Sequence, residues 1–311
     1  MRVAVLGASG FIGQEILSRP ELFPFDTRYF ARTASPGCEQ IAFGNVGSLK
    51  EVLAGMEAVV HLASNSVPST VEAGGLDAVH TSAGTLEHVI QAALAANVSK
   101  IVYLSSGGTV YGRLQSPARE LDPLRPESFY GISKLLEEAL LLRLHYRGDL
   151  QVSILRVANA YGPKQIGFRQ QGIVGAAIAC SRSGTPLTLF GSGKQVRDFI
   201  HVSDVVTAIT ASLLRDDPNP VFNIGTGIGT TVRALLDLVR STLTSPLIIN
   251  YTEERTVDLP YNVLDISKAR DVLRWTPQVE LRTGIAETLR EAKVLDSPSV
   301  DQECCKSTTD Q

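Results

Sequence analysis

Three glycines near the N-terminus limit the fold more than any other feature of this sequence. Residues 2–6 form a short apolar run that predicts a buried strand, and Gly7, Gly10 and Gly13 follow it at three-residue spacing before a helical pattern begins. Such a turn exposes backbone N–H groups at the positive end of a helix dipole, which favours a pyrophosphate. The segment predicts a dinucleotide-binding unit; the alternative is a plain glycine turn between strand and helix.

The first half of the chain alternates between strand and helix patterns, which predicts a parallel sheet with right-handed crossovers. We expect strands at 27–32, 40–43, 57–62 and 100–104, and helices at 46–53, 76–96 and 130–146. Ligands of such sheets bind at the carboxyl ends of the strands. The second strand ends at Arg32 without an acidic residue for a ribose 2′-hydroxyl. Arg32 suits a 2′-phosphate and favours NADP over NAD, unless it is a solvated side chain or stacks on adenine.

The composition argues against several other classes of protein. The 311 residues carry 29 Lys and Arg and 32 Asp and Glu without a basic block, which argues against nucleic acid as a partner. No apolar run is long enough to span a bilayer and no signal-peptide layout is present, so we expect no membrane partner and a cytoplasmic location. The four cysteines lack metal-ligand or disulfide spacing, and we expect no metal site. Cys304 and Cys305 lie in a polar segment, 296–311, that we expect to be a disordered tail.

Tyr130 and Lys134 carry the main chemical signal. They are four residues apart at the start of an apolar helix and therefore share a face. A tyrosine is a poor base at neutral pH, but an ammonium group beside a phenol favours its phenolate. The pair suits proton transfer to or from a sugar or alcohol hydroxyl. In an arbitrary helix it would be a packed tyrosine beside a surface lysine, but the glycines and the hydroxyl cluster at residues 105–109 favour catalysis.

Ordered motifs run from Met1 to about Arg290. They are GASGFIG at 7–13, VVHLA at 59–63, SSGGTVYG at 105–112, YGISK at 130–134, LRVANAYGP at 155–163, RDFIHVSD at 197–204, FNIGTG at 222–227, RTVDLP at 255–260 and DISKARDVLRWTP at 265–277. With them the chain resembles the extended short-chain dehydrogenase/reductase family, in its NAD-dependent epimerase/dehydratase branch acting on nucleotide sugars.

The resemblance implies an α/β fold: a Rossmann-type doubly wound parallel sheet with a smaller C-terminal α/β lobe that binds substrate. Residues 1–160 would form the dinucleotide-binding domain, and residues 161–295 mainly the substrate lobe, with segments returning to the first sheet. In the lobe we expect helices at 172–182, 202–214, 233–243 and 281–292, and strands at 186–190 and 247–251.

The resemblance also assigns roles to single residues. Tyr130 would be the acid/base, and Lys134 would bind the nicotinamide ribose and tune Tyr130. Asn159 would contact the sugar nucleotide. The substrate diphosphate or ribose would meet Arg197 and Arg255, with Asp258 nearby; alternatively these arginines pair with Asp198 and Asp258. The implied contacts to NAD or NADP are Gly7, Gly10, Phe11, Ile12, Gly13, Arg32, Asn45, Val46, Leu62, Ala63, Ser105, Tyr130, Lys134 and Val157.

The sequence departs from the family pattern close to the expected reaction centre. The catalytic Ser or Thr usually found four residues before the Tyr of VYG is Gly107 here. We favour Thr109 as the replacement hydroxyl and keep Ser106 open, unless both only satisfy backbone groups. Dehydratases of the family carry Asp-Glu directly before VYG, where this chain has Gly108 and Thr109. This argues against dehydration.

We therefore expect a nucleotide-sugar 4-epimerase. Tyr130 would take the O4 proton while hydride passes from C4 to the nicotinamide and later returns to the other face of the keto-sugar. Arg32 favours the alternative, an NADPH-dependent 4-keto-sugar reductase, whereas a non-catalytic regulator would not need Tyr130 and Lys134. Asn262 aligns with a residue that lines the hexose pocket of related 4-epimerases. The apolar run 135–144 is compatible with a homodimer formed through a helix bundle.

Overall fold

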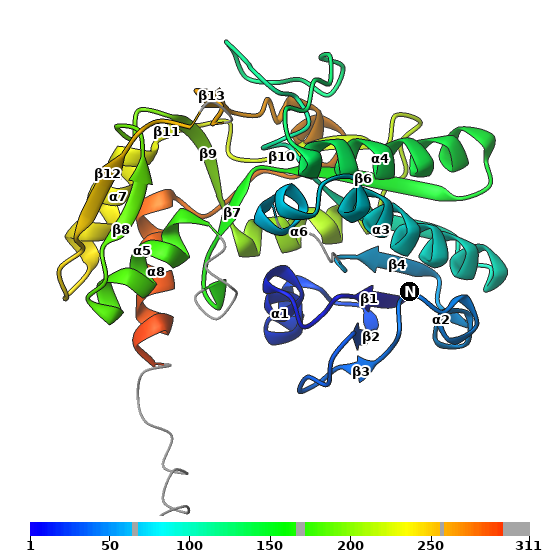
Figure 1. Cartoon of the computed structure of the whole chain (residues 1–311). Helices are drawn as coiled ribbons and strands as arrows, with labels where there is room; N and C mark the ends of the chain where they lie inside the picture. The colour runs from blue at the N-terminus through cyan, green and yellow to red at the C-terminus, as the bar shows by residue number, and fades with distance from the viewer. Residues whose placement is uncertain (64–67, 166–171, 256–257, 295–311) are drawn as a thin grey trace, which may run out of the picture.

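The computed structural model describes residues 1–63, 68–165, 172–255 and 258–294 (Figure 1). The segment 296–311, expected to be a disordered tail, lies outside the described residues, as do Cys304 and Cys305. Within the described ranges, no helix has both the length and the apolar character needed to cross a membrane.

A seven-stranded parallel sheet forms the centre of the molecule, with the strand order β10-β6-β5-β4-β1-β2-β3. Its strands are β1 (Arg2–Leu6), β2 (Asp26–Ala31), β3 (Glu39–Gln40), β4 (Ala58–His61), β5 (Lys100–Ser106), β6 (Gln151–Val157) and β10 (Val221–Ile224). The predicted doubly wound sheet is confirmed. The third strand is present but differs from the expected bounds 40–43: β3 covers Glu39–Gln40, Ile41 N still donates to Ala31 O, and the chain then turns toward the N-cap of the next helix at Asn45.

Helices cover both faces of this sheet (Figure 1). One face carries α2 (Val46–Leu53), α3 (Pro68–Ala95) and α4 (Phe129–Arg147), and the other carries α1 (Phe11–Ser18) and α6 (Val202–Leu213). Leu86 of α3 and Leu141 of α4 are fully buried against the first face. The helix expected at 46–53 is confirmed to the residue. The helix expected at 76–96 corresponds to the second part of α3, because Gly75, with φ 56° and ψ −137°, is not helical and divides α3 into two helices.

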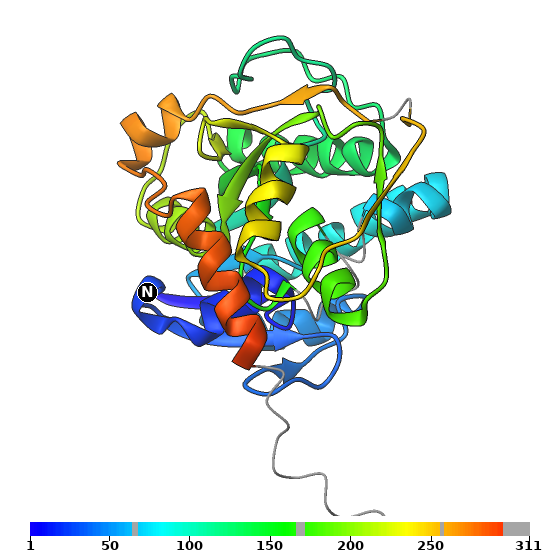
Figure 2. The same ribbon diagram turned by 90° about the vertical axis from the view of Figure 1, so that its left-hand side faces the viewer.

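A smaller group of strands and helices lies beside the large sheet (Figure 1). In it β9 (Val196–His201) pairs with β7 (Asn159–Tyr161), β11 (Gly229–Thr231) and β13 (Tyr261–Asn262), and β8 (Leu187–Phe190) pairs with β12 (Ile249–Thr252). Its helices are α5 (Ile173–Ser183), α7 (Val232–Thr242) and α8 (Leu281–Val294). Short helical turns occur at Pro20–Leu22 and Ala269–Leu273. Figure 2 looks onto α7 and α8, whose buried residues Leu235 and Ile285 share one core with Phe199.

The carboxylate of Asp198 connects the small sheet to the large one. Asp198 lies on β9, is fully buried and accepts hydrogen bonds from Thr226 N (2.8 Å), Thr226 Oγ1 (2.6 Å) and Gly227 N (3.0 Å), which directly follow β10. A fourth bond comes from Leu264 N at 3.4 Å, after β13. One side chain therefore fixes three segments that are distant in the sequence.

We expect Asp198→Ala to lower the free energy of unfolding by at least about 3 kcal/mol, because it leaves several buried donors without an acceptor. Urea denaturation measures this loss. Asp149→Ala, which removes only the exposed carboxylate paired with Arg147, serves as the control and changes the free energy by less than about 1 kcal/mol. Equal effects of the two substitutions would contradict the linking role of Asp198.

Candidate active site

The turn after β1 brings the backbone of two strands unusually close. Gly7 has φ +93°, and a Cβ there would lie 2.5 Å from Ala63 N at the end of β4. Only glycine fits both the conformation and the contact. Helix α1 then starts at Gly10, which provides no side-chain cap, so the first-turn N–H groups at Phe11, Ile12 and Gly13 are not used by a capping side chain. This glycine loop, Gly7–Gly13, has the form and polarity that a dinucleotide pyrophosphate requires.

A pocket lies beyond the end of β2. Its lining residues are Arg32, Gln40, Ile41, Ala42, Phe43, Gly44 and Thr85. Gln40 Nε2 donates to the carbonyl of Arg32 at 3.3 Å, which joins the ends of β2 and β3. Asn45 is the N-cap of α2, and its Oδ1 accepts from Ser48 N at 3.0 Å. The oxygen of Asn45 is therefore engaged, and its amide NH2 is the group it has to offer a ligand.

The first turn of α4 holds Tyr130 against the loop that follows β5. Ser128 is the N-cap and accepts from Gly131 N at 3.0 Å, while Glu72 of α3 accepts from Phe129 N at 2.8 Å. A Cβ at Gly131 would lie 2.9 Å from Thr109 O. Glycine at 131 thus permits close contact between the helix and the loop. This contact brings the first turn of α4, with Tyr130, next to the loop that carries the hydroxyl cluster.

Within that loop the two candidate hydroxyls differ. Thr109 N donates to Ser106 O at 3.2 Å, and Thr109 Oγ1 is buried without a hydrogen-bond partner among the described residues. Ser106 is half-buried at the end of β5. Ser105 donates instead to the buried carboxylate of Glu138. Because a buried hydroxyl without a partner is costly, Thr109 is the better placed of the two to receive a ligand.

The place of the missing family hydroxyl is filled by an apolar side chain. A Cβ at Gly107 would lie 2.6 Å from Leu264 Cδ1 and 3.0 Å from Arg156 O. Gly107 N donates to Val157 O at 2.9 Å, and Gly107 O accepts from Asn262 Nδ2 at 3.0 Å. Asn262, expected to line the hexose pocket, is fully buried, and its side-chain amide bonds the backbone of this loop.

Lys134 is buried one turn along α4 from Tyr130, with its Nζ 5.8 Å from the centre of the Tyr130 ring. Its ammonium donates to Tyr103 Oη at 2.8 Å and to Glu137 Oε2 at 3.2 Å. Burial alone would lower the pKa of Lys134, but Glu137, Tyr130 and Glu138 together outweigh it, and the pKa is raised. Sequence reasoning missed Tyr103 and Glu137, although the three-residue spacing of Lys134 and Glu137 on a helix was available as a signal.

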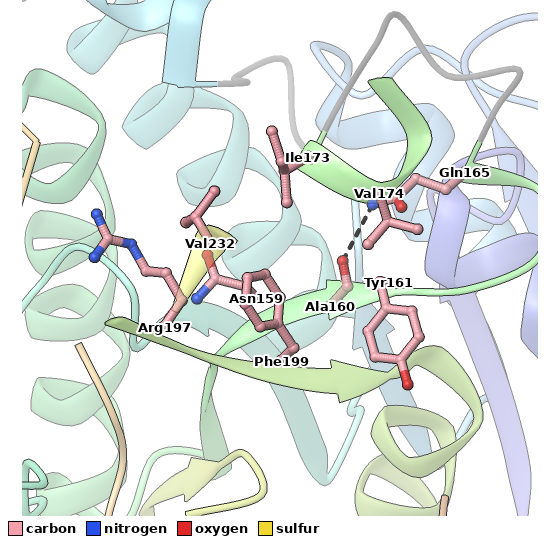
Figure 3. A pocket seen from close by; sticks show the side chains of 10 residues that line it. Asn159, Ala160, Tyr161, Gln165, Ile173, Val174, Arg197, Phe199 and Val232 are labelled. Carbon is pink, nitrogen blue, oxygen red and sulfur yellow. Dashed lines mark hydrogen bonds between the residues drawn. The ribbon is translucent and has the colours of Figure 1, made fainter. Parts of the chain in front are cut away.

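A second pocket lies between β7, β9 and α5 (Figure 3). Figure 3 shows Arg197 at one end, Tyr161 and Gln165 at the other, and Asn159 and Phe199 between them. Asn159 Nδ2 donates to Asp198 O at 3.0 Å, and Gln165 Nε2 donates to Ala160 O at 3.1 Å. The structure thus brings together two predicted substrate residues, Asn159 and Arg197. Sequence reasoning missed the apolar wall, although Phe199 lies within a quoted motif.

The two candidate phosphate-binding arginines differ in their contacts. Arg197 does not pair with Asp198; its guanidinium donates to Val196 O at 2.9 Å, and burial lowers its pKa while Asp258 opposes the shift. Arg255 forms a bidentate pair with Asp258, at 3.1 and 3.0 Å, and stacks 4.0 Å over the ring of Phe190. The Asp258 carboxylate that opposes the pKa shift of Arg197 is thus engaged by Arg255, and within the described residues Arg197 forms no ion pair, which suits it to an anion.

A glycine loop before a helix, a tyrosine–lysine pair and a pocket lined by Asn159 and Arg197 are typical of dinucleotide-dependent enzymes that transfer hydride and a proton. The sequence profile of the NAD dependent epimerase/dehydratase family matches residues 3–225. The chain belongs to this family and is an NAD(P)-dependent enzyme.

The chain is 32% identical over 306 residues to UDP-glucose 4-epimerase of Mycolicibacterium smegmatis, covering 93% of this chain and 97% of the relative. It is 26% identical to dTDP-4-dehydro-6-deoxyglucose reductase of Escherichia coli, covering 94% and 97%. Its fold is similar to the crystal structure of Thermotoga maritima UDP-glucose 4-epimerase with UDP-glucose (TM-score 0.88, 27% identity, 95% and 99% covered). The Thermus thermophilus UDP-glucose 4-epimerase complex with NAD is also similar (TM-score 0.85, 27% identity, 94% and 99% covered).

We expect Gly107→Ser to destabilise the protein by about 1–3 kcal/mol, because the new side chain overlaps Leu264. Leu264→Ala opens space for it, so the double variant loses less stability than the sum of the single variants by about 1 kcal/mol or more. Urea denaturation of the four proteins measures this coupling. Gly44→Ser is the control, since a Cβ at Gly44 meets nothing within 4 Å. Additive losses at 107 and 264 would rule out the overlap.

Proposed function

We propose that the protein is a nucleotide-sugar 4-epimerase that acts on a UDP-hexose or another NDP-hexose. The observation that carries the proposal is the tyrosine–lysine pair of α4 beside a loop that has no carboxylate at Gly108 or Thr109. A proton-transfer pair without an additional acid suits oxidation and reduction of a carbinol rather than elimination. The similarity to two UDP-glucose 4-epimerases over nearly the whole chain supports the same choice.

In the proposed reaction Tyr130 takes the proton of the sugar O4 and later returns it. Bound NAD(P) supplies the hydride chemistry at C4. The Lys134 ammonium stabilises the Tyr130 phenolate and binds the nicotinamide ribose, and Thr109 or Ser106 holds the reacting hydroxyl. Asn159 orients the sugar nucleotide.

The remaining predicted residues divide between cofactor and substrate. Arg197 and Arg255, with Asp258 between them, bind the diphosphate, which leaves the hexose free to turn over during the reaction. Residues 1–160 hold the cofactor, and residues 161–295 mainly bind the substrate. The proposed cofactor contacts are Gly7, Gly10, Phe11, Ile12, Gly13, Arg32, Asn45, Val46, Leu62, Ala63, Ser105, Tyr130, Lys134 and Val157.

An NADPH-dependent reductase of an NDP-4-keto-sugar is the second candidate. Arg32 favours it, because it lies in the pocket at the end of β2 where a ribose 2′-phosphate would bind. The similarity to the Escherichia coli reductase also supports it. The two functions differ in whether the cofactor is consumed.

We also propose that two copies of the chain associate through α3 and α4. These helices pack against each other on the outside of the sheet, and they expose large apolar side chains: Leu76 is 61% exposed, Ile132 41% and Leu136 39%. Pairing these surfaces between two copies would remove the side chains from water.

The purified protein should interconvert UDP-glucose and UDP-galactose without net consumption of cofactor. Tyr130→Phe should reduce turnover by at least about 100-fold, since it removes the acid/base, yet keep its affinity for NAD. Chromatography of the sugar nucleotides and equilibrium cofactor binding measure the two effects. Tyr146→Phe, at an exposed tyrosine near the end of α4, is the control and keeps full activity. Normal turnover by Tyr130→Phe would refute the assignment, and stoichiometric NADPH consumption with a 4-keto-sugar would favour the reductase.

The Arg32→Ala substitution tests the choice of cofactor. If Arg32 pairs with a 2′-phosphate, we expect the affinity for NADPH to fall by about tenfold or more and the affinity for NADH to stay unchanged. Fluorescence titration with each cofactor measures the difference. Arg147→Ala, which removes an exposed guanidinium paired with Asp149, should change neither affinity. Equal NADPH binding by Arg32→Ala and the unmodified protein would remove the argument for NADP.

A further inference from the structure

A buried polar cluster lies behind Tyr130, on the sheet side of α4. Its members come from four elements and are no more than 6% exposed: His61 of β4, Ser82 of α3, Tyr103 of β5, and Lys134 and Glu137 of α4. The proposed reaction uses only Lys134 from this cluster. Tyr103 and Glu137 bond its ammonium, Ser82 bonds Glu137, and His61 stacks on Tyr103.

Glu137 is the centre of the cluster. Its carboxylate accepts from Ser82 and Tyr103, from Lys134 at 3.2 Å and from Ser133 at 3.4 Å. Burial alone would raise the pKa of Glu137, but the charge of Lys134 and these hydrogen bonds outweigh it, and the pKa is lowered. Glu137 is therefore an ionised carboxylate, sealed from water, whose nearest charged partner is Lys134.

The ammonium of Lys134 has three N–H donors. Two of them are used, by Tyr103 Oη at 2.8 Å and by Glu137 Oε2 at 3.2 Å. Tyr103 itself donates to Glu137, so lysine, tyrosine and glutamate form a closed ring of hydrogen bonds. A closed ring fixes the rotation of the ammonium and leaves a single N–H for the nicotinamide ribose.

Few other charges act on this part of α4. His61 stacks on Tyr103 with ring centres 6.0 Å apart, and burial lowers its pKa to about 4, so it is neutral near pH 7. Glu138, next to Glu137, is neutralised by Arg156 of β6 at 2.7 Å. Glu72 of α3 binds the backbone at Phe129. The Lys134 ammonium and the Glu137 carboxylate are thus the two opposite charges that Tyr130 experiences from behind.

We propose that Glu137 is a positioning residue that orients the Lys134 ammonium and offsets part of its charge at Tyr130. A lone ammonium would stabilise the Tyr130 phenolate strongly. The carboxylate 3.2 Å from Lys134 weakens that field at Tyr130. The inference rests on the proposed role of Tyr130 as the acid/base and adds a residue that sets the pH range in which it works.

The test is a pH titration of the Tyr130 phenolate by ultraviolet difference absorbance, without cofactor or sugar. Because the chain has eight tyrosines, each protein is compared with its own Tyr130→Phe version. Glu137→Gln keeps the shape and removes the charge, so we expect the midpoint of phenolate formation to move down by about one pH unit. The control Glu87→Gln removes the same charge from an exposed site on α3 and keeps the original midpoint.

An unchanged or raised midpoint in Glu137→Gln would overturn the proposal, as would an equal shift in Glu87→Gln. If Glu137→Gln does not fold, Glu137→Asp replaces it, since aspartate keeps the charge but withdraws it from Lys134; a smaller downward shift is then expected, and no shift overturns the proposal. The titration needs no turnover. Failure to epimerise any sugar nucleotide would therefore contradict the proposed function alone. An unchanged midpoint of phenolate formation in Glu137→Gln would contradict the role of Glu137 alone.

Discussion

The proposed chemistry depends on the contact between the first turn of α4 and the loop after β5. A Cβ at Gly131 would lie 2.8 Å from Pro126 Cβ and 2.9 Å from Thr109 O, so the helix can approach this closely only at a glycine. The second of these contacts is with backbone, and no rotamer change would relieve it. The contact brings the start of α4, with Tyr130 and Lys134, to the edge of the sheet where the strands end and ligands bind.

The distribution of charge differs between the two sides of that edge. Behind α4, buried charges are matched: Arg156 pairs with Glu138 at 2.7 Å, and Lys134 pairs with Glu137 at 3.2 Å. At the second pocket the charges are not matched in this way. Arg197 forms no ion pair within the described ranges and donates instead to a backbone carbonyl. Unpaired positive charge at a pocket attracts an anionic ligand, whereas two paired opposite charges in a core largely cancel at a distance. The same chain thus separates the groups that hold its structure from those available to a diphosphate.

Local pattern predicted much of the fold and less of the site. Glycine spacing and apolar runs located β1, and the helix at 46–53, because these elements follow from nearby residues alone. The pattern did not show that Tyr103 faces α4. Alternate residues of a strand point to opposite faces of the sheet, but in a strand buried on both faces the sequence does not say which residues face which helices. It also did not place Asn262 against Gly107, because the two are 155 residues apart and meet only through β13.

Gly107 shows why a motif and its surroundings have to be considered together. In the sequence, Gly107 stands where the family usually has a catalytic Ser or Thr. In the structure, Leu264 occupies the space that a side chain would need, and Asn262 holds the carbonyl of the same residue. The glycine at 107 therefore fits its surroundings, because a side chain there would meet Leu264. Thr109, two residues further on, keeps a buried hydroxyl without a partner among the described residues. A buried hydroxyl without a partner is costly, which agrees with the proposed contact between Thr109 and the reacting sugar hydroxyl.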